Sequence, residues 1–268
     1  MKVYTRSFIA FALASTLTAT SHGTTLVSGF ESNADGALVG QLSPEGQTWV
    51  ESDATTPILN VSSGEVSFGA TGQDASVSLG SSFSDTTIYF GFTLTMTAAN
   101  ANAGGDFFAS LGSSTTGSGS VTAARLYATS SGATTGDYFL GGRTAALGGQ
   151  TFGTGELDYG TPYRVVMAYT AADGTGTAGY NIYLDPTSEI EGNNITYVSY
   201  TRTGSTGLND VGSFSIRQIG GNAGGISDLV VATTFEEAAA IPEVSTLSAF
   251  LGVSALSLAI LRRRCKNS

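Results

Sequence analysis

The sequence has few of the side chains that enzymes use for imidazole, thiolate or amine chemistry. Its single histidine is His22, its single cysteine is Cys265, and its two lysines are Lys2 and Lys266. The stretch Gly23–Ala240, called the body below, therefore lacks all three residue types. This absence excludes a Ser–His–acid triad, a cysteine nucleophile, a lysine Schiff base and a His/Cys zinc site from the body. It also excludes a disulfide framework there, and no GxxxxGK[ST] phosphate-binding loop occurs.

Charged residues are also scarce, at 12% of the chain, and they are unevenly placed. The body carries five arginines against twenty acids, a net charge of −15. Six of the eleven basic residues lie among the first six or the last seven residues. An acidic body is repelled by nucleic acid, so we expect no nucleic-acid partner. The acids could attract divalent cations or basic partners, or they could serve only to keep an exported protein soluble.

Glycine, serine and threonine are abundant, and this composition disfavours long helices. Five segments of the body alternate between apolar and polar residues, a period of two that predicts β-strands separated by turns rich in Gly, Asn, Asp and Ser. These segments are 87–96, 163–169, 180–184, 213–217 and 229–232. Asp173-Gly174-Thr175-Gly176 predicts a hairpin turn between two of them. We expect a β-sandwich whose core includes the single tryptophan, Trp49.

The two ends of the chain differ from the body. Residues 1–23 combine Lys2 and Arg6, an apolar stretch over 8–14 and a run of small residues, which is typical of a secretory signal helix. Residues 241–268 begin with Ile241, Pro242 and Glu243 and continue with 18 uncharged residues, at the lower limit for crossing a bilayer. The basic tail that follows would hold that end in the cytoplasm. It consists of Arg262, Arg263, Arg264 and Lys266.

The C-terminal segment resembles the PEP-CTERM sorting signal, which consists of a Pro-Glu-Pro motif, one hydrophobic helix and a terminal arginine cluster. Pro242 and Glu243 match the first two motif positions, and Val244 stands in place of the second proline. The resemblance implies that an exosortase in the inner membrane recognises and removes the tail. It also implies an exported protein that passes through an inner-membrane intermediate to the cell surface or the extracellular matrix, where polysaccharide is the expected partner.

The body resembles the LamG-like, concanavalin A-type jelly rolls that often accompany such tails. The segments that carry the resemblance are Gly29–Ser32, Asp106–Gly112, Tyr163–Met167, Asn181–Pro186 and Ile226–Phe235. It implies an all-β jelly-roll sandwich over 24–240, between a signal peptide at 1–23 and a sorting signal at 241–268. This fold hosts lectins, adhesion modules and glycosidases alike, so it does not by itself define a function.

Paired carboxylates are the one catalytic arrangement that the composition leaves open. Glu156 and Asp158 would share a face if they lay on a strand, although the flanking glycines favour a loop. Laminarinase-like glycosidases of this fold carry Glu-x-Asp-x-x-Glu, and here Thr161 occupies the third acidic position. We therefore expect no enzyme. The expected function is that of a non-catalytic surface or matrix protein, with a carbohydrate-binding module or a glycosidase as alternatives.

Oxygen ligands for calcium are plentiful, and the sequence leaves a bound calcium ion open while implying no other cofactor. The candidate ligands are Asp173, Asp185 and Asp228, although Asp173 also suits a turn and Asp185 a strand end. Sugar binding would need exposed aromatic side chains, which equally serve as strand filling. The aromatic candidates are Tyr127, Tyr138, Tyr159, Tyr197 and Tyr200.

Overall fold

The computed structural model describes most of the body. The described residues are 23–30, 33–53, 55–113, 115, 122–144, 150–172, 177–203, 209–218 and 220–240. Three predicted features lie outside them: the signal helix up to residue 22, the sorting segment from Ile241 with its motif and basic tail, and the turn at 173–176. Within the described ranges, no helix combines the length and apolar character that a membrane span requires.

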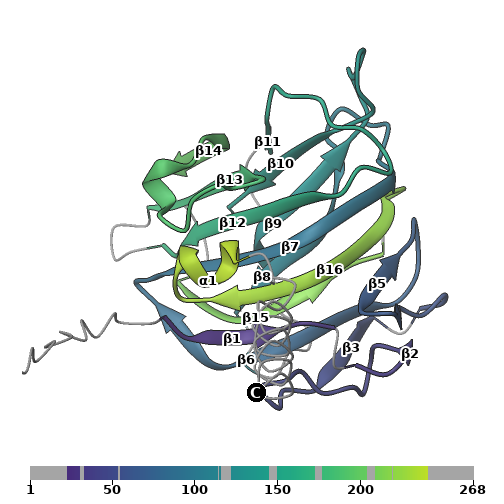
Figure 1. Ribbon diagram of the computed structural model, residues 1–268, viewed down its shortest axis with the longest axis vertical. Coiled ribbons are helices and arrows are strands. Elements are labelled where there is room, and N and C mark those ends of the chain that lie inside the picture. The colour runs from purple at the N-terminus through teal and green to yellow at the C-terminus, as the bar shows by residue number, and fades with distance from the viewer. Residues whose placement is uncertain are drawn as a thin grey trace, which may run out of the picture.

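Two antiparallel sheets form a sandwich, and the larger sheet has nine strands (Figure 1). The strands of this sheet are β1 (Thr25–Ser28), β2 (Gly36–Ala37), β4 (Asn60–Ser62), β5 (Glu65–Phe68), β7 (Thr87–Ala98), β12 (Tyr163–Thr170), β13 (Ala178–Leu184), β14 (Thr196–Arg202) and β16 (Ala223–Ala232). Their spatial order is β14-β13-β12-β7-β16-β5-β4-β2, and β1 also pairs with β16.

The smaller sheet has seven strands in the order β11-β10-β9-β8-β15-β6-β3. These strands are β3 (Trp49–Asp53), β6 (Asp74–Ser84), β8 (Asp106–Gly112), β9 (Thr122–Thr129), β10 (Phe139–Arg143), β11 (Thr151–Phe152) and β15 (Asp210–Ile216). Two short helices complete the described chain, the 3₁₀ turn η1 (Glu191–Asn193) and α1 (Phe235–Ala239).

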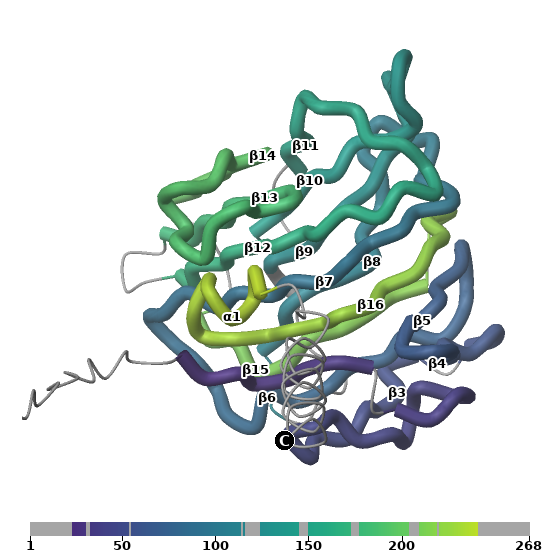
Figure 2. The backbone as a smooth tube through the Cα atoms, in the orientation of Figure 1, coloured from purple at the N-terminus to yellow at the C-terminus, as the bar shows by residue number. Residues whose placement is uncertain are grey.

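The chain changes sheet at β6, β7 and β8, and then forms two meanders, β8–β11 in the smaller sheet and β12–β14 in the larger (Figure 2). The last two strands return to the middle of the sandwich. β15 enters between β6 and β8, and β16 enters between β7 and β5. Strands that are distant in sequence therefore lie side by side in both sheets, which makes the sandwich a single cooperative core.

The inner faces of the two sheets supply that core. Trp49 is fully buried, with its ring 5.7 Å from that of Phe30 and 6.4 Å from that of Phe214, so the prediction that it lies in the core is confirmed. The five predicted strands are confirmed as β7, β12, β13, β15 and β16. Along β7 the buried residues Ile88, Phe90 and Phe92 alternate with partly exposed ones at its start, which is the pattern of a strand with one face in the core.

The helix α1 packs on the outer face of the nine-stranded sheet, across β7, β12 and β16 (Figure 1). The ring of Phe235 lies 5.0 Å from that of Tyr183, edge to face. Arg164 reaches the end of the helix and donates hydrogen bonds to the carbonyl oxygens of Ala238 (2.6 Å) and Ala240 (3.2 Å). A Cβ at Gly91 would overlap the Ala238 carbonyl oxygen, so this close approach of α1 to the sheet requires glycine.

The two ends of the body leave the sandwich side by side. β1 pairs with β16, and beyond the ladder the N–H of Thr24 donates to Thr233 Oγ1 while the N–H of Thr233 donates to the carbonyl oxygen of Thr24. The segments expected to carry the export and sorting signals are therefore attached to neighbouring points on the same sheet.

Candidate functional site

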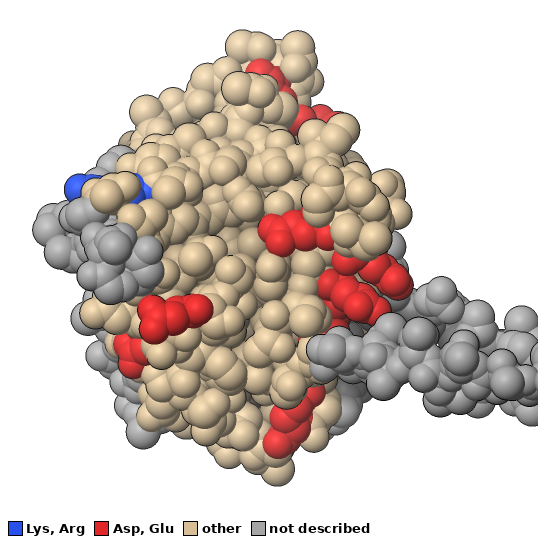
Figure 3. All heavy atoms as spheres, turned by 90° about the vertical axis from the view of Figure 1, so that its left-hand side faces the viewer, with Lys and Arg blue, Asp and Glu red and all other residues tan. Residues whose placement is uncertain are grey.

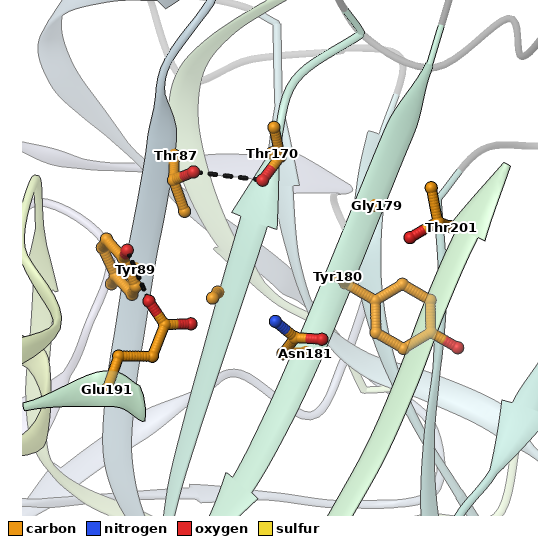
Figure 4. Close-up of a pocket in the computed structure, with 9 residues that line it drawn as sticks. Thr87, Tyr89, Thr170, Gly179, Tyr180, Asn181, Glu191 and Thr201 are labelled. Atoms are coloured by element: carbon orange, nitrogen blue, oxygen red, sulfur yellow. Dashed lines mark hydrogen bonds between the residues drawn. The ribbon is translucent and has the colours of Figure 1, made fainter. Parts of the chain in front are cut away.

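A polar hollow of about 250 Å³ opens on the outer face of the nine-stranded sheet, beside α1 (Figure 4). Its floor follows from the strand register. One row across β7, β12 and β13 consists of Tyr89, Ala168 and Asn181, each paired directly with the next. The neighbouring row consists of Thr87, Thr170, Gly179 and Thr201. Alanine and glycine at the centre of the two rows leave the depression that the longer side chains surround.

Glu191, in the turn η1, forms one wall of the hollow. Each of its carboxylate oxygens accepts a hydrogen bond from a tyrosine hydroxyl, at 2.9 Å from Tyr89 and at 2.8 Å from Tyr183. An ionised carboxylate offers about four acceptor positions, so about two remain for a ligand. The two tyrosines hold the carboxylate in one orientation before any ligand arrives. This order lowers the entropic cost of binding.

These two tyrosines stay neutral over the whole physiological pH range. Burial, followed by the hydrogen bond to Glu191, raises the pKa of Tyr183 to about 12. The same two causes raise the pKa of Tyr89 further above its usual value. Both hydroxyls therefore remain donors to Glu191.

The rest of the hollow offers neutral hydrogen-bonding groups. The hydroxyls of Thr87 and Thr170 lie 3.0 Å apart and bond to each other, and Thr201 adds a third hydroxyl (Figure 4). Asn181 contributes an amide with both donors and an acceptor. The hydroxyl of Tyr180 does not face the hollow, because it donates a hydrogen bond to the carbonyl oxygen of Gly142 on the core side. The arrangement can bind a small hydroxyl-rich ligand.

Glu156, the sequence candidate for glycoside hydrolysis, holds a loop instead. Its carboxylate accepts hydrogen bonds from the backbone N–H groups of Gly136 (2.5 Å), Thr135 (2.5 Å) and Thr134 (3.1 Å). These bonds, that from Gly136 foremost, lower the pKa of Glu156 to about 2. A carboxyl group that stays ionised at neutral pH is a poor general acid. Asp158 is exposed and lies two residues away in irregular chain, as the flanking glycines suggested.

Two of the three calcium candidates lie among the described residues, and each accepts a hydrogen bond from the protein. Asp173 lies outside the described residues. Asp185 follows β13, where its Oδ1 accepts the N–H of Arg164 at 2.8 Å. Asp228 lies in an irregular part of β16 with a φ of 51°, and its Oδ2 accepts the hydroxyl of Thr93 at 2.8 Å. Among the described residues, no group of three or more His, Cys, Asp and Glu side chains could hold a metal ion.

Four of the five tyrosines considered for sugar binding lie within or against the core: Tyr138, Tyr159, Tyr197 and Tyr200. The fifth, Tyr127, is 5% exposed, and its ring centre lies 5.6 Å from that of Phe107. Tyr138 is fully buried and stacks on Tyr159, with ring centres 5.4 Å apart. Tyr200 stacks on the buried Tyr180 at 5.9 Å. Their rings fill space between strands, as aromatic residues in sandwiches commonly do.

The sequence predicted three of the four strands of the hollow, β7, β12 and β13, but neither β14 nor the hollow itself. Alternation places Thr87 and Tyr89 on one face of their strand, and Gly179 and Asn181 on one face of theirs. The neighbours of each strand and its register are decided by long-range pairing, for which the local pattern gives no signal. Glu191 lies in a turn outside the alternating segments, so no local pattern indicated its role.

No family model matches this sequence, and a search of curated proteins gives no match either. Among solved structures, the chain is similar to an endo-β-1,4-glucuronan lyase from the fungus Trichoderma reesei, with 14% identity, 76% of this chain and 95% of that chain covered, and a TM-score of 0.41. It is also similar to peanut lectin (13% identity; 78% and 98% covered; TM-score 0.40) and to lectin II from Ulex europaeus (10%; 72% and 95%; 0.39). All three TM-scores are below 0.5, so the assignment of a two-sheet antiparallel sandwich rests on the strand order of this chain.

Proposed function

We propose that this chain is a non-catalytic exported protein whose sandwich binds polysaccharide in the hollow on the nine-stranded sheet. The observation that carries the proposal is the carboxylate of Glu191, oriented by two tyrosine hydroxyls beside a floor of threonine hydroxyls and one amide. Sugar hydroxyls both donate and accept hydrogen bonds, and the hollow presents groups of both kinds.

The ligand expected for the hollow is a neutral glycan. The fixed charge among its lining residues is that of Glu191, which would repel a sugar carboxylate and accept the hydrogen of a sugar hydroxyl. The hollow is shallow and presents few hydrogen-bonding groups, so we expect it to bind one glycan segment with modest affinity. Binding to a polymer, with many repeated units, would raise the overall avidity without further contacts.

The proposal also includes a type of sandwich, a route of export and the absence of catalysis. The return of β15 and β16 to the middle of both sheets is consistent with a concanavalin A-like jelly roll. Export, sorting by an exosortase and delivery to the cell surface follow from the resemblance of the two terminal segments to their signals. The glycosidase alternative is disfavoured by the role of Glu156 in holding the 134–136 loop.

Affinity electrophoresis of the full-length chain through gels containing neutral polysaccharides tests the hollow. Asn181→Ala removes an amide that could bind the ligand, and we expect about twofold to tenfold weaker retardation. Glu191→Gln should weaken it by about tenfold or more, since hydrogen bonds to a charged group are stronger. Glu189→Gln, an exposed position nearby, is the matched control and should bind as the wild type does. Equal retardation of all four proteins would refute the assignment of the hollow.

The intact mass of the protein recovered from its native envelope tests export and sorting separately. We expect a mass that lacks the first twenty-odd residues and everything beyond Glu243. A mass that retains the tail would make 244–261 a permanent anchor, and the proposed sorting would be wrong.

A further inference from the structure

The two tyrosines that orient Glu191 also contact the helix α1. The ring centre of Phe235 lies 5.0 Å from that of Tyr183 and 6.0 Å from that of Tyr89, edge to face in both pairs. The hydroxyls of the same two tyrosines donate to different oxygens of the Glu191 carboxylate. A continuous series of contacts therefore runs from the helix, through two aromatic rings, to the charged wall of the hollow.

These contacts belong to a small apolar cluster that is separate from the main core. The cluster lies between α1 and the outer face of the nine-stranded sheet (Figure 1). Its buried members are Val166, Ala168, Tyr183, Phe235, Ala238 and Ala239, and Tyr89 packs against them. Ala168 and Tyr89 also line the hollow, but Phe235 is not among the lining residues. Phe235 can therefore affect a ligand in the hollow only through the side chains that it contacts.

The docking of α1 depends on this cluster and on Arg164 rather than on surface charge. Arg164 donates to the carbonyl oxygens of Ala238 and Ala240 and so holds the C-terminal end of the helix. The helix itself carries Glu236 and Glu237. Figure 3 shows acidic groups scattered over one side of the molecule and basic atoms only near one edge. A helix with two acids gains little attraction from such a surface.

The turn that carries Glu191 is braced within itself, and the tyrosines join it to the sheet. The side-chain amide of Asn194 makes four hydrogen bonds to backbone groups of residues 187–190, at 2.8–3.1 Å. The turn can therefore keep its shape without α1. The position of its carboxylate relative to the strands depends on the hydroxyls of Tyr89 and Tyr183.

Undocking of α1 would remove order from both tyrosines. Edge-to-face contact stabilises a pair of aromatic rings beyond the area that the pair buries. Without Phe235, the rings of Tyr89 and Tyr183 gain space and further side-chain conformations. The carboxylate that they hold becomes less ordered, and a ligand that needs it in one orientation binds more weakly. Linkage requires the converse as well, so a bound ligand must stabilise the docked helix by the same factor.

We infer that α1 positions the carboxylate of the hollow, so that the docking of α1 and the binding of a glycan stabilise each other. Phe235 is the positioning residue, and it acts through Tyr89 and Tyr183. The coupling to glycan binding rests on the proposed function, whereas the coupling between Glu191 and α1 does not. A pull at Ala240 that detaches α1 would therefore lower the affinity of the hollow.

Hydrogen–deuterium exchange of the full-length chain without ligand tests the coupling between Glu191 and α1. Glu191→Ala removes the acceptor of both tyrosine hydroxyls, and the amides of residues 238 and 240 should exchange about twofold to tenfold faster. Thr201→Val, which removes a hydroxyl from the β14 side of the hollow, is the matched control and should leave these amides unchanged. Equal exchange in Glu191→Ala and the wild type overturns the inference, as does an equal acceleration in Thr201→Val.

Affinity electrophoresis in gels with dextran or soluble starch tests the coupling to glycan binding. Phe235→Ala should weaken retardation by about twofold to tenfold, and Phe235→Leu, which keeps much of the bulk, should recover part of it. Phe107→Ala is the matched control, because it removes a ring of similar exposure (7% against 5%) that contacts a tyrosine in the other sheet. It should bind as the wild type does. Thermal unfolding of each variant identifies any that fails to fold.

The reciprocal measurement is exchange in the presence of the polysaccharide that retards the wild type. At saturation, the α1 amides of the wild type should exchange more slowly by the same twofold to tenfold factor, and those of Phe235→Ala should not. A purely structural role of Phe235 would produce no such protection by ligand.

The outcomes separate the inference from the proposed function. If folded Phe235→Ala binds as the wild type does while Glu191→Gln binds weakly, the positioning role is overturned and the hollow remains the binding site. If neither polysaccharide retards the wild type, the proposed function and its coupling to α1 are both overturned. The exchange measured without ligand then still decides whether α1 and Glu191 are coupled.

Discussion

The docking of α1 on the sheet provides a sharp test of the packing described above. Gly91 lies on β7 beneath the end of α1, and a methyl group there would overlap the Ala238 carbonyl oxygen. In Gly91→Ala either the strand or the helix must move. The strand is held on both sides by β12 and β16, so we expect α1 to lift away.

The magnitude follows from the contacts at stake. Burying a side chain such as that of Phe235 is worth about 1.5–3 kcal/mol, and the hydrogen bonds from Arg164 to the helix end add to this. Overpacking costs about 1–3 kcal/mol, which is enough to weaken the docking of α1 without unfolding the sandwich. The opening equilibrium of α1 should therefore increase by about 5-fold to 150-fold.

Hydrogen–deuterium exchange measures this opening at the amides of α1. In Gly91→Ala the amide hydrogens of residues 238 and 240, which bond within the helix, should exchange faster by that factor, while those of β7 keep their protection. Gly192→Ala is the matched control, since a Cβ there meets nothing within 4 Å. Unchanged exchange in α1, or an equal loss of protection across both sheets, would refute this account of the docking.

Three further predictions concern stability. Glu156→Gln should lower the melting temperature above about pH 4.5, and the difference should vanish toward pH 2, because the lowered pKa of Glu156 gives stability that is lost as pH falls. Trp49→Ala should cost about 3–5 kcal/mol in chemical denaturation, since the side chain is fully buried, and a loss under 1 kcal/mol would contradict its place in the core. Chelation with EDTA should leave the melting temperature unchanged, because the described residues include no group of three or more metal-ligating side chains; a clear drop would show that a bound metal ion, the calcium that the sequence left open, stabilises the protein.

The sequence predicted the strands that have large apolar residues at every second position. β7 and β12 have them, and both were predicted within a few residues of their ends. β6 was missed because serine and glycine occupy much of its second half, where the local pattern resembles a loop. Trp49 was assigned to the core correctly because a single large aromatic residue gains most by burial.

The candidate site was harder to predict than the fold. The floor of the hollow depends on Tyr89, Ala168 and Asn181 lying in one row, which requires the register of three strands that are distant in sequence. The contacts of Arg125 and Arg217 with the ring of Phe107 have the same origin, since they require β15 to return beside β8. Glu156 was singled out for its chemistry, and its partners at 134–136 reveal a structural role.

The place of α1 after β16 also determines how the body would respond to force. Tension applied at Ala240 acts first on α1, whose attachment is a small apolar contact and the hydrogen bonds of Arg164. β16, the next element, is ten residues long and lies between β7 on one side and β5 and β1 on the other, so a pull along its axis must shear many backbone hydrogen bonds at once. A body pulled through its C-terminal end would first lengthen slightly as α1 detaches, and would then resist strongly while the sheet that carries the hollow stays intact.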